Sequence, residues 1–386
     1  MRPPVISADS HVTEPPHAWD DVEPAFRDRV PRVHHVESAG DVYVIDGMKT
    51  PVPLGIVAAA GKPPEQIRMM GTRFEELHRG GWDPAARLLD QDRDGVAAEV
   101  IYPTVGMVLC NHPDPDYKKA CFDAYNRWIA AYCAHAPARL LGVGQTAMRT
   151  PEEGIRDLEA MAALGLRGVM MPANPVVADY DAPEYDEFWE AAIEIGLPLA
   201  FHILTGRDFV TATRRGPKMN GFLGVIRGCQ DIMGMLVLGG VFERHPRLRV
   251  VCVEADAGWV PHFMYRMDHA WKRHRNWLPA GQELTRLPSE WFASGIYTTF
   301  QDDWVAFRSV DMLDWHRLLW ANDFPHSDST WPWSQQMLAE HGAALTSEQR
   351  EAILSRNAAE LYRIDLDALA RLAPGAAGAA ATGHGA

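Results

Sequence analysis

The chain has 386 residues, of which 47% are hydrophobic and 23% are charged, a composition typical of soluble globular proteins. Its 37 lysines and arginines against 51 aspartates and glutamates give a formal net charge of −14, which argues against nucleic acid or an anionic membrane as the main partner. The N-terminus lacks the apolar region of a signal peptide, and no run reaches about 18 apolar residues. We therefore expect no membrane span and a cytoplasmic location.

Short apolar runs with the length and composition of buried parallel strands recur along the whole chain. In chain order they are 5–11, 97–105, 139–147, 166–172, 197–203, 248–255, 295–300 and 317–323. Helix-like patterns lie between most of them, at 116–136, 151–163, 184–195, 221–244, 257–275, 302–313, 333–341 and 347–362. Eight strand–helix alternations predict an α/β protein with a (β/α)8 TIM barrel fold.

A doubly wound sheet is the structural alternative to the barrel. That fold would need a glycine-rich phosphate loop after the first strand, and residues 9–16 (DSHVTEPP) contain no glycine. We therefore favour a single barrel domain over residues 1–372. Residues 14–90 are too long for one loop and predict an insertion over the barrel mouth. The Gly/Ala-rich residues 373–386 predict a disordered tail.

Acidic and imidazole side chains stand at the ends of four predicted strands. The first strand ends in Asp9 and His11, which are two residues apart and so share one face. His202 stands on the fifth strand and Glu254 at the end of the sixth. The eighth strand ends in Asp323, and His326 follows three residues later. In a (β/α)8 barrel, these strand ends converge on one mouth, where active sites lie.

Each of these residues alone has an ordinary structural explanation. A lone histidine is commonly a hydrogen-bonded loop residue, a lone aspartate is commonly a helix N-cap, and Glu254 could pair with a buried arginine. Together, however, several buried carboxylates would be costly without a compensating cation. We therefore predict a divalent metal (iron, manganese or zinc), with one or two ions per chain, because carboxylate and imidazole suit these metals.

These residues also carry a resemblance to a known family. Asp9-x-His11, His202 and Asp323, with the segments 238–268 and 320–332, resemble the amidohydrolase superfamily over residues 4–363. The pattern is most similar to the branch that includes aminocarboxymuconate-semialdehyde and hydroxybenzoate decarboxylases. The resemblance implies that Asp9, His11, His202 and Asp323 hold a divalent metal, and that Asp323 also handles a proton.

The chain departs from the family pattern at three strands. Asp9 stands where many relatives have histidine, and Glu254 stands where many decarboxylases have histidine. The fourth strand ends in 170-MMP-172, which supplies no ligand for the usual bridge between two metals. Glu254 and His326 would extend the ligand set to six, which leaves both one and two ions open.

We interpret this set as the site of a metal-dependent hydrolase. Metal-activated water would attack an amide, ester, lactone or thioester, with Asp323, Glu254 and His326 as the catalytic groups. The alternative is a non-oxidative decarboxylase of an aromatic or unsaturated carboxylic acid. The absence of a histidine on the sixth strand makes this alternative less favoured but does not exclude it. A third reading, a barrel that only binds ligands, would predict a missing core ligand.

The substrate is expected to be a small, partly apolar and anionic molecule. Arg207 belongs to a basic loop after the fifth strand that could capture a carboxylate or phosphate. Trp259 after the sixth strand and His112 after the second are further candidate substrate contacts. The amphipathic segment 257–275 could form the surface of a homodimer.

Overall fold

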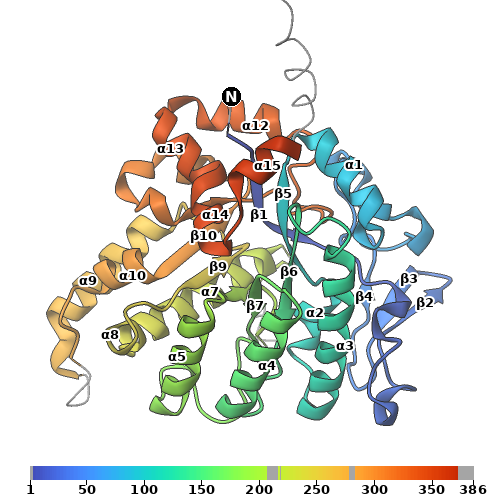
Figure 1. The fold of residues 1–386 in the computed structure, drawn as a ribbon, viewed down its shortest axis with the longest axis horizontal. Helices are drawn as coiled ribbons and strands as arrows, with labels where there is room; N and C mark the ends of the chain where they lie inside the picture. Colours follow the sequence, from blue (N-terminus) through green and yellow to red (C-terminus); the bar gives the residue numbers. More distant parts are fainter. Residues whose placement is uncertain (1–2, 207–215, 218, 278–282, 373–386) are drawn as a thin grey trace, which may run out of the picture.

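The structure is a computed structural model that describes residues 3–206, 216–217, 219–277 and 283–372. Eight strands form one sheet, in the order β1-β5-β6-β7-β8-β9-β10-β11, and every pair between neighbours is parallel. This confirms the predicted (β/α)8 barrel, which Figure 1 shows with its helices packed around the strands. The strands are Ile6–His11 (β1), Ala98–Tyr102 (β5), Leu140–Gln145 (β6), Gly168–Met170 (β7), Leu199–His202 (β8), Val250–Val253 (β9), Ile296–Phe300 (β10) and Leu318–Trp320 (β11).

The barrel closes where the first and last strands meet. The backbone N–H of Asp323, beyond the end of β11, donates to the carbonyl of Asp9 at 3.0 Å, and the N–H of His11 donates to the carbonyl of Phe324 at 2.6 Å. The side chain of Asn322 accepts from the hydroxyl of Ser7 at 2.9 Å. The seam thus consists of bonds made by the same residues that we predicted as metal ligands, or by their neighbours.

The helices follow the strands as the sequence pattern predicts, with capping residues that explain their bounds. Asp114 and Thr150 accept from backbone N–H groups of the first turn of α3 and α4 respectively. Gly196 and Gly240 adopt left-handed backbone at φ of +75° and +74°, so α5 ends there and the predicted helix 221–244 divides into α7 and α8. The helices of this ring are Val105–Leu109 (α2), Pro115–Cys133 (α3), Pro151–Ala163 (α4), Asp186–Ile195 (α5), Asn220–Leu238 (α7), Val241–Arg244 (α8), Val260–His274 (α9), Pro288–Gly295 (α10), Trp304–Arg308 (α11), Ser334–His341 (α12), Ser347–Glu351 (α13), Asn357–Tyr362 (α14) and Leu366–Leu372 (α15).

The insertion between β1 and β5 forms a small antiparallel sheet and a helix. The sheet is β2 (Arg32–Val36), β3 (Gly40–Val44) and β4 (Val52–Pro53), and the helix is α1 (Pro84–Asp94). The N–H of Ala60 donates to the carbonyl of Pro325, and the N–H of Ser327 donates to the carbonyl of Ile56. The insertion therefore packs against the loop that follows β11, at the carboxyl end of the strands.

Helix α7 is long and apolar enough to cross a membrane by length and composition alone, although only a third of its apolar window is buried. These two properties are weak evidence, because a barrel helix can share them, and α7 buries Cys229, Met233 and Leu236 in the barrel core. On α9, Tyr265 is exposed. Formation of a homodimer through this helix stays a prediction.

Candidate metal centre

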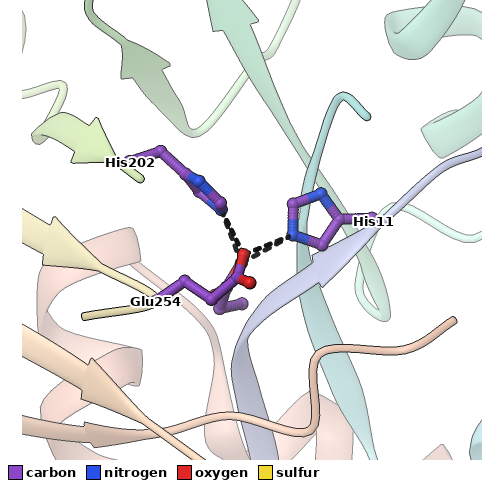
Figure 2. Close-up of side chains that lie close together, drawn as sticks. His11, His202 and Glu254 are labelled. Carbon is purple, nitrogen blue, oxygen red and sulfur yellow. Dashed lines mark ion pairs between the residues drawn. The ribbon is translucent and has the colours of Figure 1, made fainter. Parts of the chain in front are cut away.

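The predicted ligands from four strands lie together in the structure. Two overlapping groups of donor atoms form, each with all its atoms within 4.8 Å of one another: Asp9, His11, His202 and Glu254, and His11, Glu254, Asp323 and His326. Figure 2 shows His202 and His11 directed from opposite sides toward the carboxylate of Glu254. Asp9, His11 and Asp323 have no exposed surface, and His202 is 1% exposed. The arrangement is a buried cluster of three carboxylates and three imidazoles at one end of the barrel.

Irregular backbone directs these side chains inward. The pairing of β1 with β5 shifts register between Ser7 and Ser10, which is a β-bulge beside Asp9. Glu254 and Asp323 adopt left-handed backbone at φ of +57° and +50°, which is uncommon for residues other than glycine. Such strain persists where the surrounding structure holds it, and it gathers at functional sites. The left-handed backbone of Glu254 also explains why β9 ends at Val253.

The donor atoms lack partners within the protein. Both carboxylate oxygens of Asp9 and of Asp323, Oε2 of Glu254, and Nε2 of His11 and of His202 are buried without a hydrogen-bond partner. Buried polar atoms are rarely left so. His11 Nε2 lies 3.4 Å from Asp9 Oδ1, 3.5 Å from Glu254 Oε2 and 3.4 Å from Asp323 Oδ1, and His202 Nε2 lies 3.2 Å from Glu254 Oε2. Ligands bound to one ion at about 2.0–2.2 Å lie roughly 3.0–3.5 Å apart, so the cluster fits a divalent metal.

The outer ring nitrogens fix the orientation of two histidines. Nδ1 of His11 lies 3.0 Å from the carbonyl of Pro103, and Nδ1 of His202 lies 3.0 Å from the carbonyl of Ile203. A carbonyl only accepts, so Nδ1 carries the proton in each ring and donates it. The lone pair of Nε2 then points into the cluster, which is the arrangement that metal-binding histidines require.

Charges within the cluster separate the carboxylates into two kinds. Burial would raise the pKa of Asp9, but hydrogen bonds and charge from His11 and His202 outweigh it and lower the pKa to about 2. Burial would lower the pKa of His11, but Asp9 and Glu254 raise it to about 9. Burial, with the charges of Glu254 and Asp9, raises the pKa of Asp323 well above its ordinary value. The side chains alone therefore favour an ionised Asp9 and protons on Asp323 and on His11; a bound cation would replace the proton on Nε2 of His11.

His326 lies beside Asp323 and is held from its other side by Thr104. Its ring stacks on His11 at 3.9 Å between centroids, and its Nδ1 lies 3.0 Å from Asp323 Oδ1. The Thr104 hydroxyl donates to the carbonyl of Val12 at 2.6 Å, so it can only accept from Nε2 of His326, at 2.9 Å. The lone pair of Nδ1 therefore faces Asp323, and burial lowers the pKa of His326 well below its ordinary value.

Three residues that the sequence analysis does not name support the cluster. Besides Thr104, buried Glu14 accepts from the N–H groups of Thr104, Val105 and Gly106 at 3.0–3.1 Å. Buried Arg87 donates to the carbonyl of His11 at 2.7 Å and pairs with Glu99 at 2.5 Å. Glu14 lies only three residues after His11, and Thr104 lies at the end of the predicted strand 97–105. Their positions in the sequence therefore indicated that both could lie near the cluster. Arg87 lies in the insertion, and its position gave no such indication.

The predicted substrate contacts either bond to other groups of the protein or lie outside the described residues. Nε2 of His112 is 2.6 Å from the carbonyl of Asp46, and its Nδ1 accepts from the N–H of Asp114. The indole N–H of Trp259 donates to the carbonyl of Ala255, and its ring packs against α9 and α10. Arg207 lies outside the described residues. A substrate role for these three residues stays a prediction.

Comparisons with known proteins agree on the family and fold. A family model described as amidohydrolase matches residues 9–364. A curated 2-amino-3-carboxymuconate-6-semialdehyde decarboxylase of Dictyostelium discoideum is 27% identical over 205 residues, which span 52% of this chain and 55% of that protein. An amidohydrolase from Mycobacterium avium subsp. paratuberculosis matches with a TM-score of 0.76 and 19% identity, over 94% of this chain and all of that one. A manganese-bound mutant of the 5-carboxyvanillate decarboxylase of Novosphingobium aromaticivorans matches with a TM-score of 0.67 and 16% identity, over 93% and 97%.

The prediction of hydrolysis as the main reaction is wrong. Two curated relatives and several solved structures of similar fold are decarboxylases, which supports the alternative reading. The wrong prediction comes from the argument that a carboxylate at Glu254, in place of histidine, disfavours decarboxylation. A cation beside a proton-carrying carboxyl group serves both reactions, so the ligand set does not distinguish them.

Proposed function

Because the chain belongs to the amidohydrolase family, we propose that it is a metal-dependent, non-oxidative decarboxylase of an aromatic or unsaturated carboxylic acid. The main support is the similarity of the sequence to decarboxylases. The buried cluster, which fits a divalent cation, agrees with it. The aligned segment spans little more than half of the curated relative. The substrate class is accordingly part of the proposal.

Asp9, His11, His202, Glu254 and Asp323 would hold the metal. His11 and Glu254 belong to both groups of donor atoms, and the single free nitrogen of His11 cannot bind two ions at once. This favours one ion per chain. The oxygen-rich set is compatible with manganese, iron or zinc, and manganese is present in the related 5-carboxyvanillate decarboxylase. Once bound, the ion supplies the positive charge that attracts the oxygens of an anionic substrate.

The proton needed for decarboxylation would come from Asp323. Burial, with the charges of Glu254 and Asp9, raises the pKa of this carboxyl group well above its ordinary value, which favours a bound proton. Asp323 transfers the proton to the carbon that bears the carboxylate, using an electron pair of the substrate double bond. The carbon–carboxylate bond then breaks, its electron pair restores the double bond, and carbon dioxide leaves.

His326 and Thr104 would keep Asp323 in place for this transfer. The neutral His326 ring presents a lone pair to Asp323 Oδ1, and its Nε2–H is bonded to Thr104. After transfer, the Asp323 carboxylate regains a proton from solvent. Enclosure by the insertion and the loop after β11 limits water, which keeps the substrate carbon as the favoured proton acceptor.

The test is decarboxylation of a panel of hydroxybenzoic, vanillic-type and muconic-type acids by the manganese-loaded protein in D2O. We expect carbon dioxide and a product with one deuterium on the carbon that lost it. Carbon dioxide should form with no water consumed. A product that carries oxygen from labelled water, with no carbon dioxide, would refute the proposal.

A further inference from the structure

Two adjoining cavities lie at the end of the barrel opposite the metal cluster. Their volumes are about 220 Å³ and 310 Å³, and they share Gly196, Leu197, Leu361 and Arg363 as walls. Arg167, Pro198 and Arg249 line them and directly precede β7, β8 and β9, whereas the metal ligands stand at or just beyond the carboxyl ends of their strands. The cavities and the metal cluster are therefore separate sites.

The walls carry an excess of arginine in a chain with a net charge of −14. Arg167, Arg249 and Arg363 have no carboxylate partner within 4 Å among the described residues, and Arg247 has only Glu190, at 3.8 Å. Glu360 is the one acidic residue among the residues described as lining the cavities. The guanidinium groups thus outnumber the acids that could neutralise them.

A further arginine adds to this positive charge. Arg317 stacks over the ring of Tyr297 with its Cζ 4.8 Å from the centroid, and Tyr297 lines the smaller cavity together with Arg249. Burial and the nearby charge of Arg317 lower the pKa of Arg249. The charged form of Arg249 is therefore destabilised, which is uncommon for arginine. A bound anion would offset the repulsion between Arg249 and Arg317.

The backbone around Arg363 is built so that its side chain reaches the cavities. Arg363 adopts left-handed backbone at φ of +56°, at the end of α14, where glycine is the usual residue. Gly196, whose own left-handed backbone ends α5, lies against the Arg363 guanidinium, which donates to the carbonyl of Ile195 at 3.4 Å. Left-handed backbone at a residue other than glycine is strained and gathers at functional sites.

We propose that this basic pocket binds a small oxyanion, either a phosphate or a carboxylate. Guanidinium groups bind both through paired N–H donors. Arg249 and Arg363 line the smaller cavity from different segments, so an anion between them would contact both. The apolar residues Leu197, Leu248 and Leu361 form the remaining wall, which suits the organic part of a carboxylate.

Isothermal titration calorimetry of the metal-loaded protein tests this site, with inorganic phosphate and benzoate as probes at constant ionic strength. Besides any anion bound at the metal cluster, which His202→Ala removes, we expect saturable binding of one anion per chain, and the tighter probe identifies the class. Arg249→Gln should weaken binding at least about tenfold, since each lost charged hydrogen bond is worth that much. Arg363→Gly should do the same while leaving the melting temperature unchanged or higher, because glycine relaxes the left-handed backbone.

Two controls separate this pocket from other binding sites. Arg308→Gln removes an exposed arginine of α11, outside the cavities, and should leave anion binding unchanged. His202→Ala disrupts the metal cluster, and binding at the basic pocket should persist in it. The proposal is overturned if neither probe binds saturably, if Arg249→Gln and Arg363→Gly bind as tightly as the unmodified protein, or if His202→Ala abolishes binding.

Discussion

Replacing Arg87 with methionine should destabilise the folded protein by about 3–5 kcal/mol, the usual cost of leaving one partner of a buried ion pair uncompensated. Arg87 and Glu99 are 0% and 1% exposed, and their Nε and Oε2 atoms lie 2.5 Å apart. The substitution also removes the donor to the carbonyl of His11, at 2.7 Å. The loss has two parts, an unpaired charge on Glu99 and an unpaired carbonyl at the barrel seam.

A second substitution separates these two parts. Glu99→Gln in the Arg87→Met background removes the unpaired charge and should recover a large share of the loss. The unpaired carbonyl of His11 should still cost about 1–3 kcal/mol. Urea unfolding followed by tryptophan fluorescence measures both variants, and metal content by mass spectrometry shows whether the seam still presents its ligands. An Arg87→Met variant within 1 kcal/mol of the unmodified protein would refute this account, as would a double variant no more stable than Arg87→Met.

Three further predictions concern the metal cluster and its surroundings. His202→Ala should lose bound metal and decarboxylation while its circular dichroism stays unchanged, and retention of about one metal per chain would contradict the ligand assignment. Asp323→Asn should lower kcat by about 10²–10⁴-fold, the usual effect of losing an acid–base group, with most of the metal retained because the asparagine carbonyl oxygen can still bind a cation; unchanged kcat would exclude Asp323 as the proton donor. Burial raises the pKa of Asp94 from 3.8 to about 6, so the folded state binds more protons than the unfolded state between these values. The Asp94 carboxyl group should therefore reduce stability as pH rises from 4 to 6, by up to about 3 kcal/mol, and Asp94→Asn should gain stability relative to the unmodified protein over this range; a constant difference between the two proteins would contradict the raised pKa.

The barrel could be predicted because each strand has a local apolar signal and the helices between them carry caps and periodicity. Short elements were less predictable: the predicted helix 302–313 reduces to Trp304–Arg308, and α10 was missed between the predicted helix 257–275 and the predicted strand 295–300. Bounds also differ because β7 and β11 have only three residues each in the sheet. Residues that flank β7 and β11 are also apolar because they pack in the core. The predicted apolar runs are therefore longer than the strands.

The location of the metal cluster followed from the sequence because the barrel fold brings strand ends together. The support around it did not, since Arg87 contacts His11 across 76 positions and Thr104 contacts His326 across 222. Such pairs depend on tertiary packing that no local pattern records. The reaction type was mispredicted for a chemical reason: the same ligands serve hydrolysis and decarboxylation.

The closing seam of the barrel has a consequence for how the protein is made. Asp323, and with it the bond to Asp9, becomes available only after more than three hundred residues have followed Asp9 and His11 from the ribosome. A complete ligand set therefore exists only once the last strand has docked against the first. Binding to a site that forms only on folding adds its free energy to the stability of the folded state. Metal uptake would therefore stabilise only the finished chain. Truncated or unclosed chains would stay unloaded, and metal content would report the completion of synthesis.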